Sequence, residues 1–285
     1  MAHPTPEQEA YMRAHIHEDR RHYVIGMHSG FLVLGVLSVI LRFLSRIKIG
    51  AKLGKDDWLI LIALVSLAGH AIPCMVIVRF GVGRHVLLIS DPQGIALANL
   101  VGATAYSLTL MFTKLSILAL YHRIFSLTRG WMPTLYTIAG FVIALGLIQP
   151  FVYIFQCIPI SATWEGIENA KCINFGLAII ILGAIHIVTD WLLLFLPIPV
   201  VLGLQLSNRV KASICSLFMV GAVVCIISII RLQRAHEIGG TTDPTWTYVP
   251  IQALTTVEGA IGILAACMPT WRPLFRFLGQ GVSSY

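Results

Sequence analysis

Seven long apolar stretches fill most of this 285-residue chain, and they indicate that it folds in a lipid bilayer and not in water. Each is close to the roughly 20 residues that a helix needs to cross a bilayer. Hydrocarbon offers no water to the backbone, so each span must satisfy its own hydrogen bonds as a helix. Charged residues make up only 12% of the chain, about half their usual share in soluble domains. The sequence predicts an all-α, polytopic, seven-transmembrane-helix bundle, with spans at about 23–41, 57–78, 95–120, 135–156, 174–202, 212–230 and 248–268.

The rest of the chain is too short to form a second folded unit. We expect a short polar N-terminal segment at 1–22, a membrane domain at 23–268 and a short cytosolic tail at 269–285. The polar start has neither the apolar core nor the small-residue cleavage site of a signal peptide, so the first span should be retained as an anchor. Pro269 is expected to close the seventh helix.

The distribution of Lys and Arg predicts the orientation of the spans. The first, third and fifth loops and the tail hold 11 of these residues, and the other side holds 8, with Arg231 counted in the sixth loop. This favours an N-terminus outside and a C-terminus in the cytosol, in the plasma membrane or an internal membrane. We expect the basic residues behind the net charge of +7 to contact anionic membrane lipid, and we expect no binding of nucleic acid. The excess of Lys and Arg on the cytosolic side comes from the first loop, to which we assign Arg42, Arg46, Lys48, Lys52 and Lys55.

The six cysteines fall into two groups. Four lie within spans, where cysteine commonly serves as a small apolar packing residue. Cys157 and Cys172 bracket the fourth loop, which the charge count places outside, where a disulfide persists. We expect these two to form a disulfide. We expect no metal site, because no pair of cysteines shows the close spacing of zinc ligands.

Among the ionisable residues within the predicted spans, we single out Lys114, His186, Asp190 and Glu258. Charged groups are costly in hydrocarbon, so each is a functional candidate. Lys114 could pair with Asp190 or Glu258, while His186 and Asp190 lie four residues apart on one helix face. Three interpretations stay open: a polar network that holds the helices together, the lining of a ligand pocket or switch, and an acid–base site with Asp190 or Glu258 as the catalytic candidate.

Retinal is a cofactor that the sequence argues against. A retinylidene protein needs a buried lysine for its Schiff base, normally on the seventh helix. The seventh span at 248–268 has no lysine, and Lys114 lies on the third. We therefore expect no retinal and no other cofactor.

An ordered set of motifs resembles the fungal "rhodopsin domain" family of seven-helix membrane proteins. Each motif alone is weak, but together they cover residues 42–275. The resemblance implies a receptor-like architecture, and some members are encoded in secondary-metabolite clusters. The motifs are RFLSR and GKDDW at 42–58, FGVGRH at 80–85, KLSILALYHRIF at 114–125, CIPISATW at 157–164, DWLLLFLPIP at 190–199 and AACMPTWRPLF at 265–275.

We therefore expect a receptor-like membrane protein that binds a small lipophilic molecule within the bundle. Lys114, His186, Asp190 and Glu258 would line the site, and a cytosolic signalling partner would complete the receptor role. The alternative is a membrane-embedded enzyme that tailors a fungal secondary metabolite. Whether the chain is an enzyme stays open at this stage.

Overall fold

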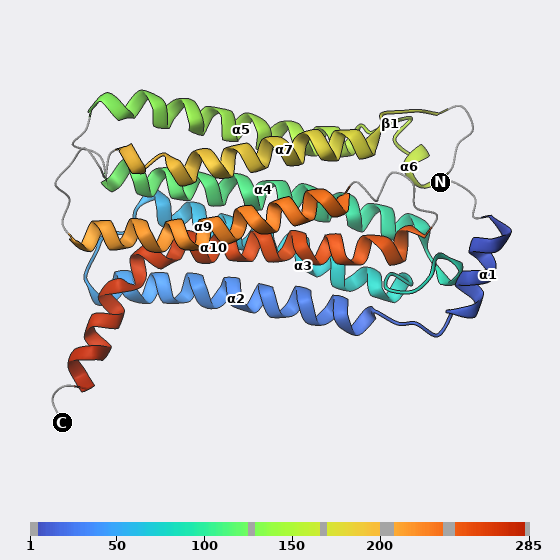
Figure 1. Cartoon of the computed structure of the whole chain (residues 1–285), viewed down its shortest axis with the longest axis horizontal. Helices are drawn as coiled ribbons and strands as arrows, with labels where there is room; N and C mark the ends of the chain where they lie inside the picture. The colour runs from blue at the N-terminus through green and yellow to red at the C-terminus, as the bar shows by residue number, and fades with distance from the viewer. Residues whose placement is uncertain (1–4, 125–128, 166–169, 200–207, 236–242, 283–285) are drawn as a thin grey trace.

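The structure, a computed structural model, describes residues 5–124, 129–165, 170–199, 208–235 and 243–282. Within these ranges, seven helices are long and apolar enough to cross a membrane, which confirms the predicted seven-helix architecture. They run side by side along the long axis of the molecule (Figure 1). The helices are α2 (Arg21–Lys48), α3 (Lys55–Val76), α4 (Pro92–Ile124), α5 (Met132–Ile154), α7 (Phe175–Phe195), α9 (Asn208–Ala235) and α10 (Pro244–Val282).

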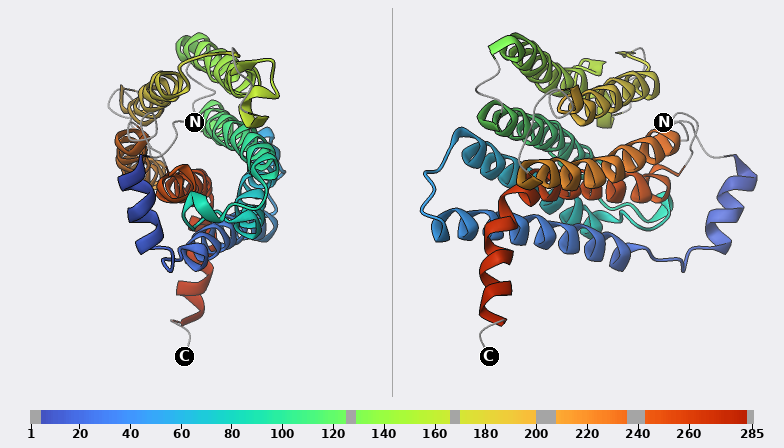
Figure 2. Two further views of the ribbon diagram at one scale, coloured as in Figure 1. Left: turned by 90° about the vertical axis from the view of Figure 1, so that its right-hand side faces the viewer. Right: turned by 60° about the vertical axis from the view of Figure 1, so that its left-hand side comes forward.

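Helix α10 lies inside the bundle. It packs against α2, α3, α4 and α9, and the end-on view in Figure 2 shows it enclosed by other helices. In its most apolar window, 56% of the residues are buried within the protein, whereas no other span exceeds 39%. Its polar residues Thr256 and Glu258 are fully buried and therefore contact protein and not lipid.

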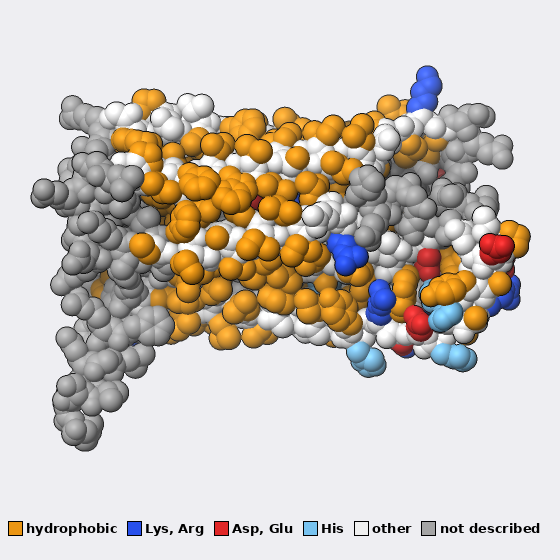
Figure 3. All heavy atoms as spheres, viewed as in Figure 1, with side chains coloured by type: hydrophobic (Ala, Val, Ile, Leu, Met, Phe, Trp, Pro, Cys, Tyr) orange, Lys and Arg blue, Asp and Glu red, His pale blue; other side chains and the backbone are white. Residues whose placement is uncertain are grey.

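The outward surface of the bundle is apolar. Figure 3 shows hydrophobic side chains covering the middle of the visible face, with charged side chains gathered toward the end that carries the N-terminus. Val65, Phe151 and Met219, from three different helices, are each at least 60% exposed. So continuous an apolar surface is unfavourable in water, and this face is suited to contact with lipid acyl chains.

Short elements cover the end of the bundle at which the chain begins. They are α1 (Pro6–Ala14), η1 (Ile77–Phe80) and η2 (Val86–Leu88). Asp19, between α1 and α2, bonds to Arg21 at 2.6 Å and lies 3.6 Å from Arg84. The hydrogen bond from Arg21 is the main cause that lowers the pKa of Asp19 to about 2. This carboxylate therefore stays ionised at physiological pH and links α2 to the loop after η1.

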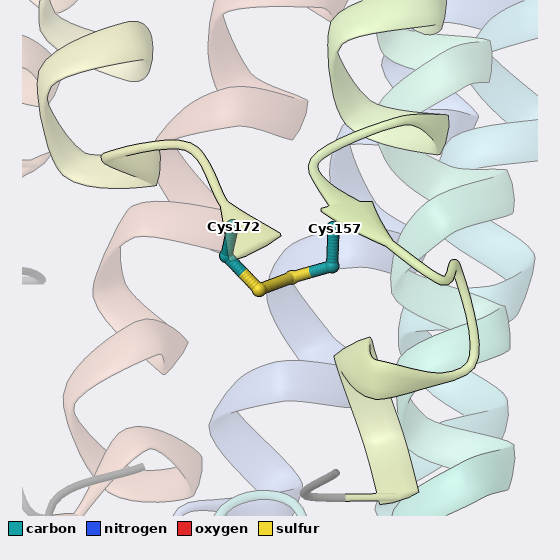
Figure 4. Close-up of a disulfide and its surroundings, with 2 residues drawn as sticks. All are labelled: Cys157 and Cys172. Atoms are coloured by element: carbon teal, nitrogen blue, oxygen red, sulfur yellow. A yellow bond between two sulfur atoms is a disulfide. The ribbon is translucent and has the colours of Figure 1, made fainter. Parts of the chain in front are cut away.

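A disulfide closes the loop between α5 and α7 at the same end. Cys157 and Cys172 lie opposite each other in the antiparallel strands β1 (Cys157–Ile158) and β2 (Lys171–Cys172). Figure 4 shows the sulfur–sulfur bond joining the two strands. Between them lies the single turn α6 (Ala162–Glu165).

The ends of four helices differ from the sequence expectation. Helix α2 continues to Lys48 and α9 to Ala235, so residues assigned to loops lie on helices. Helix α7 ends at Phe195, just before Pro197, and 200–202 of the predicted fifth span lie outside the described residues. Helix α10 does not end at Pro269: it runs on to Val282, and Figure 1 shows its last turns bending away from the bundle. Prolines commonly bend a helix without ending it when packing or new partners support the backbone.

Candidate functional site

A cavity of about 60 Å³ lies among α4, α7, α9 and α10. Lys114 and Thr113 reach its wall from α4, Asp190 from α7 and Glu258 from α10. The rest of the wall is made of leucine, isoleucine, valine, alanine and glycine residues together with Tyr121. The cavity therefore combines an apolar surface with a few convergent polar groups, which is the usual character of a small-molecule site.

Lys114 contacts three acceptors on α7. Its Nζ lies 2.9 Å from Oδ1 of Asp190, and it donates to Oγ1 of Thr189 at 2.6 Å and to the carbonyl of His186 at 3.1 Å. A lysine ammonium has three protons to donate, and these three acceptors match them. The geometry fits the charged form of Lys114, whereas Schiff-base formation requires a free neutral amine.

Glu258 forms the second buried ion pair. Its Oε2 lies 2.7 Å from Nε of Arg231 on α9, and the same oxygen accepts from the hydroxyl of Tyr106 at 2.7 Å. Its Oε1 accepts from Ser228 at 2.6 Å. Glu258 is completely buried, and Arg231 also lies over the Tyr106 ring, 5.5 Å from its centroid. One carboxylate thus joins α4, α9 and α10.

His186 takes part in a different contact. Its Nε2 lies 2.6 Å from Oε1 of Gln149 on α5, and that oxygen also accepts from Ser107 at 3.2 Å. Gln149 in turn donates to the Tyr153 hydroxyl at 2.8 Å. His186 and Asp190 share a helix, but His186 is directed toward α5 and does not line the cavity. Three of the four predicted residues, Lys114, Asp190 and Glu258, therefore surround the cavity, and the fourth lies beside it.

Two polar atoms of the cavity-lining residues lack a hydrogen-bond partner in the described part of the chain. They are Oδ2 of Asp190 and the hydroxyl oxygen of Thr113, and both are buried. Unsatisfied buried polar atoms are uncommon in native proteins and call for a physical explanation. A bound molecule with a hydroxyl or similar group could satisfy them.

Arg231 belongs to this network, although the sequence predicts it in a loop. The apolar run ends at Ile230, but α9 continues for another turn to Ala235. Arg231 is 6% exposed and paired with Glu258, so it does not count among the loop residues that indicate membrane orientation. The sequence feature that indicated a buried partner was Glu258 within an apolar span, since a buried carboxylate requires a cationic or hydrogen-bonding partner.

A second buried charge cluster lies where α2 ends and α3 begins, at the end of the bundle opposite the disulfide (Figure 1). Arg42 donates from Nη2 to Asp56 at 2.6 Å, from Nε to Asp57 at 2.7 Å and from Nη1 to the carbonyl of Ala266 at 2.7 Å. Arg46 lies four residues along α2 and donates to Asp56 at 2.7 Å. The assignment of Arg42 and Arg46 to the first loop is therefore wrong, because their carboxylate partners hold them inside the bundle.

The sequence motifs explain how this cluster is built. Gly54 precedes α3, and a Cβ atom there would collide with the Asp56 carboxylate. Asp57 accepts from the Gly54 backbone N–H at 2.9 Å and caps the helix, where a negative charge is favourable. Ser116 of α4 donates to the Asp56 carbonyl at 2.8 Å. RFLSR and GKDDW are thus two halves of one ionic contact between α2 and α3, extended to α4 and α10.

The chain matches the family described as Fungal rhodopsin domain over residues 41–277. A SAT4 family membrane protein of Emericella nidulans is 34% identical over 71% of this chain, and the match spans only 52% of that protein. The Polyenoic acids biosynthesis gene cluster protein Ba17b of Metarhizium anisopliae is 30% identical, over 89% of this chain and 75% of its own length.

A third relative carries a receptor name. Receptor GIN3 of Arthrobotrys oligospora is 24% identical, over 88% of this chain and 62% of that protein. No solved structure matches. The family match covers most of the chain and includes the segments that build both buried charge clusters. This chain belongs to the fungal rhodopsin domain family of multi-pass integral membrane proteins.

Proposed function

We propose that this protein is receptor-like and binds a small lipophilic molecule in the cavity among α4, α7, α9 and α10. The observation that carries the proposal is the pair of unpartnered atoms, on Asp190 and Thr113, in the wall of a largely apolar cavity. The apolar wall favours a lipophilic molecule, and the two oxygens favour one with a hydrogen-bond donor. Lys114 and Glu258 hold the helices that carry this wall in register.

The cavity volume limits the part of the molecule that fits. About 60 Å³ is room for a small polar group and a few carbon atoms, not for a complete drug-sized ligand. A larger ligand must place its polar head here and separate neighbouring helices to accommodate the remainder. Such a movement between helices is a general means by which ligand binding shifts a receptor between states.

A cavity-filling variant tests this site. Val224→Phe should fill the cavity from α9 and weaken saturable binding of a lipophilic probe about tenfold or more, which corresponds to 1.4 kcal/mol or more. A suitable measurement is fluorescence of dehydroergosterol and of parinaryl alcohol, two lipophilic probes that each carry a hydroxyl donor, with the full chain in lipid nanodiscs. Val223→Phe is the matched control, because Val223 is the adjacent residue and is 45% exposed. Equal effects of the two substitutions, or no saturable binding of either probe to the unmodified chain, would exclude this cavity as the site.

We also propose that the N-terminus lies outside and that the Cys157–Cys172 disulfide forms there. In intact cells, a membrane-impermeant maleimide should label this pair only after reduction. Labelling of the pair without reduction would argue against the disulfide, and labelling of the reduced pair only after the cells are permeabilised would reverse the orientation. Cys157→Ser/Cys172→Ser gives the background.

The alternative is an enzyme that tailors a fungal metabolite. It is favoured by the name of Ba17b, which refers to a biosynthetic gene cluster. Asp190 would then be the stronger candidate acid, because it lines the cavity and keeps 12% of its side chain exposed, whereas Glu258 is fully enclosed. Full product formation by a producing strain with both Asp190→Asn and Glu258→Gln would rule out an enzyme that uses these residues.

A further inference from the structure

Two histidines and a cysteine meet between α2 and α3, away from the cavity. His28 comes from α2, and His70 and Cys74 come from α3, where four residues of separation place them on one face. Their ligand atoms lie within 4.8 Å of one another. All three side chains are buried, with exposures of 1%, 4% and 2%. None of them lines the cavity described above.

The His70 ring is held in the tautomer that a metal ligand requires. Its Nδ1 lies 2.9 Å from the Gly102 carbonyl of α4, and because a carbonyl only accepts, Nδ1 must carry the proton. Nε2 is then an unprotonated nitrogen with a free lone pair. It is buried and has no partner with hydrogen-bond geometry, although the Gln252 carbonyl approaches the ring. A metal-ligating histidine commonly donates its other N–H to a carbonyl in this way.

His28 is also positioned by a neighbouring helix. Its Nδ1 lies 2.6 Å from the hydroxyl of Thr256 on α10, and Thr256 donates at 3.3 Å to the Gln252 carbonyl. The two histidine rings stand 6.0 Å apart between centroids and are inclined at 66°. Metal–ligand distances are about 2.0–2.3 Å, so a central ion needs side-chain movements of under about 1 Å. The cluster is therefore close to a three-coordinate site whose outer contacts are already formed.

The donor set and its surroundings select the ion. A thiolate with two imidazoles suits copper or zinc and not a hard cation such as Mg²⁺. The group formed by the described residues contains no carboxylate. Cu(I) with one thiolate is electrically neutral, whereas Zn²⁺ would leave one positive charge in a buried, apolar setting, where charge is costly. We propose that His28, His70 and Cys74 form a buried three-coordinate site for Cu(I).

Copper competition on the purified full chain tests the site. The chain would carry a tag without histidine, and Cu(I) would be supplied anaerobically against a chromogenic chelator. We expect one tightly held Cu(I) per chain and X-ray absorption showing one sulfur and two nitrogen ligands. Cys74→Ala should weaken the affinity at least about 100-fold, since it removes a direct ligand and the loss of outer contacts alone costs about 10–100-fold. Cys225→Ala, another buried free cysteine, is the matched control and should bind like the unmodified chain.

Thr256→Val is the second variant and keeps the test decisive if Cys74→Ala does not fold. It preserves side-chain shape but removes the hydroxyl that positions His28, so we expect about tenfold weaker binding. Equal copper affinity in Thr256→Val and the unmodified chain, or in Cys74→Ala and Cys225→Ala, would overturn the proposal. So would stoichiometric binding of Zn²⁺ without binding of Cu(I).

Discussion

Arg42→Ala is expected to lower the free energy of unfolding by about 3–5 kcal/mol, because it removes the centre of a buried ion cluster and leaves carboxylates poorly compensated. Arg42 is completely buried, and it joins α2 both to α3 and to the Ala266 carbonyl of α10. Among the described residues, Arg46 and the more distant Arg123, 3.6 Å from Asp56, would remain to balance the two aspartates. The measurement is thermal unfolding of the purified chain in detergent, followed by size exclusion.

Two further variants give this measurement its controls. Lys48→Ala removes a positive charge from the exposed end of the same helix and should change stability by no more than about 0.5 kcal/mol. Arg42→Lys keeps the charge but not the planar fork that reaches three acceptors, so its loss should be intermediate. If Arg42→Ala and Lys48→Ala unfold at the same temperature, the cluster does not stabilise the fold.

Glu258→Gln is expected to produce a loss of similar size, about 3–5 kcal/mol, for the opposite reason: it leaves the buried cation Arg231 without its carboxylate. Glutamine retains the shape of Glu258 and can still bond to Tyr106 and Ser228, so the effect reports mainly on charge. Adding Arg231→Met should restore much of the stability, because the unpaired charge is then gone. Thermal unfolding of the two single variants and the double variant forms a double-mutant cycle.

The cycle separates an ion pair from simple damage to the core. Paired residues should show a coupling energy between about 0.5 and 3 kcal/mol, with the double variant more stable than the sum of the single losses predicts. Strict additivity would mean that Arg231 and Glu258 act independently, in contradiction to their 2.7 Å separation. Glu165→Gln, an exposed acid outside the spans, should leave stability unchanged.

The charged residues show how far the sequence could predict the candidate site. Lys114, Asp190 and Glu258 stand out because a charge within an apolar span is rare whatever surrounds it. Their partners could not be assigned: Lys114 could have paired with either carboxylate, and the structure gives it Asp190. Arg231 was missed because a basic residue just past an apolar run looks the same whether its helix ends there or continues.

The histidine–cysteine cluster was hidden for a similar reason. We expected no metal site because no pair of cysteines shows the close spacing of zinc ligands, but such spacing is informative only when the ligands share a turn or a hairpin. His28 and His70 are 42 residues apart and meet only because α2 and α3 are antiparallel neighbours. The alternation of two helices across a membrane gave no indication of which faces would touch.

The sequence by itself determined that this chain crosses a membrane seven times as helices, since span length and the need for internal backbone hydrogen bonds are local properties. It also determined the family, through motifs that keep their order along the chain. Only the tertiary structure decided that α10 lies inside the bundle, that Arg42 and Arg231 are buried, and which acid each basic residue meets. Lipid is as apolar as a leucine side chain, so hydrophobicity places a helix in the bilayer without choosing its neighbours. That choice depends on small surfaces and polar contacts between residues far apart in sequence.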